Sequence, residues 1–163
     1  MSTPRREILT VAQIVVLDTH PLGLASNDPR KPDAARCYQW IRALDLAGVL
    51  IFAPEIVDFE VRRELLRAGA KAGVKRLDLL LGDLIYAPIT RQVMRRAAEY
   101  WAHVRWAGLQ TAADLSLDAD CIVAAQASLV SGLGDVMTIA TRNPKHLTRF
   151  PGIDARTWES IVP

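Results

Sequence analysis

Three short apolar runs, separated by longer amphipathic segments, constrain the fold of this chain most. The runs are IVVL (14–17), VLIFA (49–53) and VMTIAT (136–141). None of them alternates with polar residues, and all are rich in β-branched side chains, which is typical of strands buried on both faces. Strands that alternate with helices predict an α/β fold: a three-layer sandwich with a central, mostly parallel sheet flanked by helices.

The spacing of the apolar residues predicts the helices between these runs. Helices are expected over about 33–48, from 54 to 69 or 73, and over 74–85, 90–107 and 116–132. Asp33 is expected to cap the first of them, and the segments from 74 to 107 to form an inserted helical layer. A loop is expected before residue 33, a turn at RNPKHL (142–147), and a short edge strand within 153–158.

Length and composition favour one globular domain. Of the 163 residues, 1–13 read as a polar lead-in, 14–158 as the domain and 159–163 as a tail. The net charge is only +2, so charge alone does not indicate nucleic-acid binding. Cys37 and Cys121 lie far apart without a CxxC pattern, which favours reduced thiols. Neither a membrane span nor a signal peptide is recognisable, and we expect a cytoplasmic protein.

Carboxylates and one amide stand at corresponding places along the chain. Asp18 follows the first apolar run, Glu60 lies early in the second helix, and Asn143 follows the third run. Asp118 and Asp120 open the buried helix. They are two residues apart, about 200° of helix rotation, so both reach one ion only if Asp118 belongs to the cap. We expect these groups to meet at the carboxyl ends of the strands, with Asp120 preferred over Asp118.

Several carboxylates in one pocket require a counter-charge. Oxygen-only ligands suit Mg²⁺ or Mn²⁺ better than zinc, so the set Asp18, Asp120, Asp118 and Asn143 predicts a hard-cation site. Such an ion can polarise a phosphodiester and activate water, with Asp18, Glu60 and Asp120 as the catalytic set. Without metal, burial and repulsion should raise the pKa of at least one of these acids.

Each of these residues also has a purely structural interpretation. Asp18 can form an Asx turn, and a carboxylate at the start of the buried helix is favoured by the helix dipole. Asn143 precedes a proline and suits a turn. Glu64, one helical turn beyond Glu60 and among arginines, is best explained as a surface ion pair.

Over residues 14–158 the chain resembles PIN-domain nucleases of the VapC toxin type. The resemblance rests on VVLDT, FEVRREL, DADCIVAAQA and IATRNPKHL. It implies an Mg²⁺-dependent endoribonuclease acting on single-stranded RNA, a cognate antitoxin and a homodimer. Asp18, Glu60 and Asp120 match the family's metal-binding acids, and Thr19 and Thr141 are expected to support them. The chain departs from the pattern at Asn143, where many members have an aspartate, and this is expected to weaken metal binding.

Basic and aromatic residues could hold the RNA. Trp101 and Trp106 could stack on bases, although their helical spacing also suits a core or a dimer face. His20 and His103 have no adjacent nucleophile, and a general-base role is not favoured. The candidates for phosphate contacts are Arg62, Arg63, Arg142 and Lys145, followed by Arg91, Arg95 and Arg96.

Two other classes of function compete with the nuclease. A PIN-fold protein without effective turnover could bind nucleic acid or regulate a partner, and the neutral Asn143 favours this alternative. A receiver domain or a haloacid-dehalogenase-like phosphatase could also use an aspartate after the first strand. Asp18, however, lacks the paired DxD motif and a matching lysine.

Overall fold

The three apolar runs form the middle of a parallel sheet. The computed structural model describes residues 11–109, 114–132 and 134–163. In this part of the chain the strand order is β3-β2-β1-β4-β5, and every pairing is parallel. The three-layer α/β sandwich is therefore confirmed. The strands are β1 (Gln13–Leu17), β2 (Leu50–Pro54), β3 (Ile85–Ala87), β4 (Val136–Thr141) and β5 (Ala155–Thr157).

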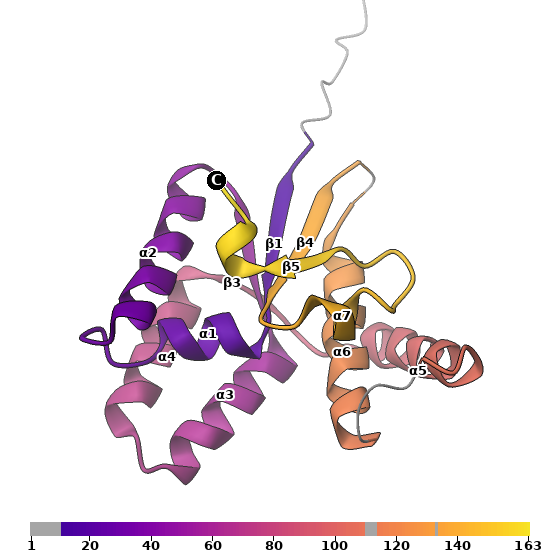
Figure 1. Cartoon of the computed structure of the whole chain (residues 1–163), viewed down its shortest axis with the longest axis horizontal. Coiled ribbons are helices and arrows are strands. Elements are labelled where there is room, and N and C mark those ends of the chain that lie inside the picture. The colour runs from indigo at the N-terminus through magenta and orange to yellow at the C-terminus, as the bar shows by residue number, and fades with distance from the viewer. Residues whose placement is uncertain (1–10, 110–113, 133) are drawn as a thin grey trace, which may run out of the picture.

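Helices lie on both sides of this sheet. In Figure 1, α1, α2 and α4 lie to the left of strands β1 and β4, and α5 and α6 lie to the right. The described helices are α1 (Thr19–Ala25), α2 (Pro32–Leu46), α3 (Glu55–Arg67), α4 (Lys71–Asp83), α5 (Arg91–Trp106), α6 (Asp114–Val130) and α7 (Pro144–Leu147). Residues 14–17 of β1 are completely buried, because the two helical layers cover both faces of the central strand.

Three local expectations were wrong. Helix α1 replaces part of the expected loop, since Pro21 falls in its first turn, where a missing N–H group costs nothing. Strand β3 lies within the expected helical layer; its three residues include exposed Ile85 and Tyr86, so no buried run announces it. Asp33 does not cap α2, whose N-cap is Lys31, and instead pairs with Arg36 at 3.2 Å. The expected RNPKHL turn also contains a single helical turn, α7.

The carboxyl-terminal residues complete the core. Trp158 and Ile161 are buried, and the indole N–H of Trp40 donates to the carbonyl oxygen of Ile161 at 2.8 Å. Ile161 therefore packs against α2. Cys37 and Cys121 are buried and free, as their spacing predicted. Among the described helices, none has the length and apolar character needed to cross a membrane.

Candidate active site

Asp18 and Thr141 meet where the strand order reverses. From β1 the chain adds β2 and β3 on one side and later β4 and β5 on the other, so the switch point lies between β1 and β4. Ligands bind at such a crevice in open parallel sheets. The Asp18 N–H extends the β1–β4 pairing by donating to Ala140 at 2.9 Å, and the buried Thr141 hydroxyl donates to Oδ2 of Asp18 at 2.6 Å. This bond fixes the carboxylate at the crevice.

Thr19 connects Asp18 to Glu60. Oδ1 of Asp18 accepts the Thr19 N–H at 2.7 Å as the N-cap of α1, so its structural role and its place in the site coexist. The Thr19 hydroxyl donates to Oε2 of Glu60 on α3 at 2.6 Å. The Glu60 side chain is 19% exposed, whereas Glu64 is 56% exposed and pairs with Arg67 at 2.8 Å. The surface ion pair expected for Glu64 is confirmed.

Asp120 approaches the same place from α6. Burial raises its pKa to about 7; the nearby Arg149 guanidinium opposes this rise, and the carboxylates of Asp18 and Glu60 add to it. The expectation that one acid of the cluster has a raised pKa is confirmed. Thr19 bonds to both Asp18 and Glu60, and Glu60 and Asp120 line one depression, so the structure brings these three acids together from three separate segments.

Arg149 was not recognised in the sequence as a site residue. Its terminal Nη2 lies 2.9 Å from Oδ2 of Asp120, and its side chain is only 5% exposed. Nδ1 of His146 lies 3.8 Å from the same oxygen. Arg149 follows α7 and is 29 residues from Asp120 along the chain. No local pattern signals such a pair, and its buried position became evident only from the fold.

Asp118 lies at the edge of the site. Helix α6 begins at Asp114, so Asp118 belongs to the helix body, and the condition under which it could share one ion with Asp120 is not met. Its side chain is exposed, while Asp120, rotated by about 200°, is half-buried. Asp118 still lines one depression together with Glu60 and Asp120. Asn143 is exposed, and its backbone N–H donates to the Thr141 hydroxyl at 3.2 Å.

The basic candidates for RNA contact differ in their surroundings. Arg62 is held by Asp58 at 2.9 Å and Asp78 at 2.8 Å, which ties α3 to α4. Arg63 is half-exposed and lies 3.7 Å from Glu60. Arg142 and Lys145 are exposed just after β4, beside the switch point. These two and Arg63 remain accessible at the site, whereas Arg62 has a structural role.

The donor set has the chemistry of a magnesium site. Within the described residues, no three acidic, histidine or cysteine side chains lie close enough to hold one ion. Mg²⁺, however, is usually bound by one or two carboxylates and retains several waters. The carboxylates of Asp18, Glu60 and Asp120 offer only oxygen ligands. Burial, together with the nearby negative charges of Asp18 and Glu60, raises the pKa of Asp120, and a cation would relieve this crowding of charge. Two carboxylates with water therefore fit this ion.

Residues 15–145 match the family model described as the PIN domain. The chain belongs to the PIN domain family. This PIN domain shares its fold with VapBC2 from Rickettsia felis bound to a promoter DNA fragment, at 20% identity and a TM-score of 0.67, covering 89% of this chain and 98% of that one. FitAcB from Neisseria gonorrhoeae has 19% sequence identity and a TM-score of 0.59, over 90% of this chain and 99% of that one.

DNA-bound VapBC from Salmonella typhimurium is also similar to this PIN domain, with 19% identity and a TM-score of 0.58 over 91% of this chain and 99% of that one. No curated protein matches the sequence significantly. The matched family region ends at residue 145, so Arg149, which contacts Asp120, lies beyond it.

Proposed function

We propose that this PIN domain is a metal-dependent endoribonuclease that hydrolyses phosphodiester bonds in single-stranded RNA or in RNA loops. One observation carries the proposal: in a PIN fold, Asp18, Glu60 and Asp120 gather near the switch point of the sheet, where burial, with repulsion from the other two acids, raises the pKa of Asp120. Buried like charges of this kind are typical of sites that bind a cation or move protons.

Asp18 and Asp120 would hold Mg²⁺ or Mn²⁺, with Glu60 beside them. When bound, the ion would supply a polarised phosphate and a more acidic water. The chain itself supplies orientation: the hydroxyls of Thr141 and Thr19 direct the carboxylates of Asp18 and Glu60. Glu60, which is not assigned as a metal ligand in this proposal, is the proposed proton acceptor.

Arg142 and Lys145 are the proposed contacts for the RNA backbone. Both are exposed directly after β4, whose last residue contacts Asp18. Their positive charges therefore border the carboxylates without neutralising them. Phosphate contacts of this type position a strand without reading its sequence. We place the scissile phosphate between these basic residues and the three acids.

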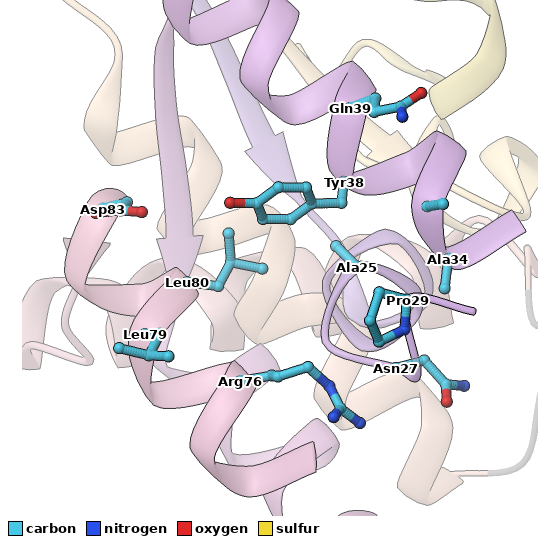
Figure 2. Close-up of a pocket in the computed structure, with 11 residues that line it drawn as sticks. Ala25, Asn27, Pro29, Ala34, Tyr38, Gln39, Arg76, Leu79, Leu80 and Asp83 are labelled. Atoms are coloured by element: carbon cyan, nitrogen blue, oxygen red, sulfur yellow. The ribbon is translucent and has the colours of Figure 1, made fainter. Parts of the chain in front are cut away.

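A cognate antitoxin is the proposed protein partner, and it would restrain the activity. The resemblance to VapC-type toxins and the fold shared with VapBC structures support this partner. An apolar groove of about 480 Å³ lies between α2 and α4, and in Figure 2 Tyr38 of α2 lies opposite Leu80 and Leu79 of α4. Arg76 and Asp83 offer polar contacts in the same groove. A homodimer and a cytoplasmic location complete the proposal.

A second candidate function is nucleic-acid binding or regulation with little turnover. Asn143 favours it, because a neutral amide stands where many family members have a fourth acid. Within the described residues the carboxylates also do not form a three-ligand cluster. Asn143→Asp adds a negative oxygen donor beside Thr141, and we expect it to strengthen Mg²⁺ binding.

The test of the nuclease proposal compares Asp120→Asn with Asp118→Asn. Asparagine preserves the volume of aspartate but removes its charge, so Asp120→Asn should abolish Mg²⁺-dependent cleavage of unstructured RNA. Asp118→Asn should retain most activity, because Asp118 is exposed at the edge of the site. Cleavage is followed on a panel of structured and unstructured RNAs, with thermal unfolding of each protein measured in parallel.

The outcomes separate the two candidates. If Asp120→Asn cleaves as well as the wild type, the assignment of the active site is wrong. If the wild type cleaves no RNA with Mg²⁺ or Mn²⁺ but Asn143→Asp does, the binding function is favoured.

A further inference from the structure

Phe59 exposes its ring beside the candidate active site. It precedes Glu60 on α3 and is 55% exposed, whereas Val57 and Val61 of the same helix are buried. Arg63 follows one helical turn later, and its guanidinium carbon lies 5.3 Å from the centre of the Phe59 ring. The same guanidinium is 3.7 Å from Oε1 of Glu60. An aromatic surface and a cation therefore adjoin a proposed catalytic carboxylate.

These residues line one depression with the acids of α6. Phe59, Glu60 and Arg63 form its α3 side, and Asp118 and Asp120 belong to its α6 side. Ile56, Ala119 and Ile122 supply apolar lining, and the volume is about 440 Å³. The depression thus combines flat apolar surface, one cation and the carboxylates. A ligand that fills it must be apolar on one part and must tolerate charge on another.

We propose that Phe59 and Arg63 form a subsite for one unpaired nucleobase next to the scissile phosphate. This inference rests on the proposed nuclease function and names how the RNA would be held. A base can stack on the Phe59 ring or on the planar guanidinium, while the phosphate attached to it reaches the Arg63 charge. Bases paired in a duplex are stacked on their neighbours and cannot enter. The subsite therefore selects unpaired RNA.

Charge distinguishes this occupant from a second copy of the chain. A protein surface that covered the depression would bury the carboxylates of Glu60 and Asp118 beside apolar side chains, at a high cost in desolvation. A nucleotide fills the apolar part with its base and leaves the acidic part to the cation that RNA cleavage requires. The mixed lining suits a nucleotide better than an apolar interface.

The test is a thermodynamic cycle between protein and RNA. Binding of a short unstructured RNA, labelled at one end, is measured by fluorescence anisotropy with EDTA present so that no cleavage occurs. Phe59→Ala should weaken binding about 5- to 150-fold, the effect of losing one base–aromatic stack. Leu66→Ala is the matched control, since Leu66 is a similarly exposed apolar residue on the same helix, and it should leave binding unchanged.

The second arm removes bases from the RNA. Each nucleotide in turn is replaced by an abasic ribose. At one position this replacement should weaken RNA binding to the wild type, whereas it should weaken binding to Phe59→Ala very little, because that variant has already lost the stack. Arg63→Gln should weaken RNA binding about tenfold. Arg67→Gln, one turn further along α3, is the control for this loss of positive charge. Equal losses for every abasic RNA in both proteins would overturn the subsite.

Phe59→Ala could instead change the molecular mass of the protein in solution, while its effect on RNA binding adds to that of each abasic replacement. This result would assign the ring to an interface between copies of the chain and would also overturn the subsite. The nucleobase subsite and the proposed nuclease function are tested by different measurements, so one can be rejected without the other. RNA cleavage by the wild type, measured with Mg²⁺, tests the function, while anisotropy tests the subsite. Cleavage that persists while Phe59→Ala binds RNA as the wild type does would reject the subsite alone.

Discussion

Arg149 supplies a buried counter-charge to Asp120 from within the same chain. Nη2 of Arg149 lies 2.9 Å from Oδ2 of Asp120, and all hydrogen bonds that Asp120 accepts from described residues fall on this oxygen. Arg149 also contacts the carbonyl oxygen of Leu109 at 3.4 Å, and its guanidinium carbon lies 5.2 Å from the centre of the Phe150 ring. The Arg149 guanidinium thus connects Asp120 of α6 to Leu109, which follows α5, and to Phe150, which follows α7.

Arg149→Met should therefore destabilise the metal-free protein. Above the pKa of Asp120, the variant would bury a carboxylate without its main partner, and we expect a loss of about 3 kcal/mol in the free energy of unfolding. Chemical denaturation measures this loss. The double variant Arg149→Met with Asp120→Asn is the control and should recover part of the stability, because no unpaired charge remains. No recovery would show that the loss of stability comes from other contacts of Arg149, such as those with Leu109 and Phe150.

Asp120 should make the stability of the metal-free protein depend on pH. Its pKa is about 7 in the folded protein, against an ordinary value of 3.8, so between these values the folded state holds a proton that the unfolded chain has lost. The stability from this proton is fully present below about pH 4 and is lost as the pH rises through about 7. Unfolding in EDTA should show this decline for the wild type but not for Asp120→Asn.

Saturating Mg²⁺ should remove the decline, because a bound cation keeps the carboxylate ionised. Identical pH profiles for the wild type and Asp120→Asn in EDTA would contradict the prediction.

Thr141→Val should weaken both stability and metal binding. The valine keeps the shape of threonine in the buried position but loses the hydrogen bond to Asp18, at a cost of about 2 kcal/mol. Thr138→Val is the matched control on the same strand, since it removes a hydrogen bond to Asp154 of 2.8 Å. Isothermal titration with Mg²⁺ should show a loss of affinity only for Thr141→Val. Equal affinities in the two variants would exclude a positioning role for Thr141.

Much of the fold could be predicted because its strongest signals are local. Strand β4 coincides with the expected run 136–141, and the centres of β1 and β2 lie where apolar, β-branched residues cluster. Such residues cannot remain in water, and runs of this length fit a strand buried between two layers. Helix α1 and strand β3 were missed because they are short and carry weak patterns. Their conformation is imposed by their neighbours in the fold.

Local sequence patterns were sufficient to predict the parallel α/β architecture, the family, and the segments that carry Asp18, Glu60 and Asp120, since strand ends and helix starts are encoded in nearby residues. The contacts among these segments depend on the tertiary structure. The bonds from Thr141 to Asp18 and from Arg149 to Asp120 join residues 123 and 29 positions apart. Partners so distant are selected by how the sheet and helices pack. Packing also leaves Asp118 in solvent while it buries Asp120, because burial depends on the orientation of a whole helix.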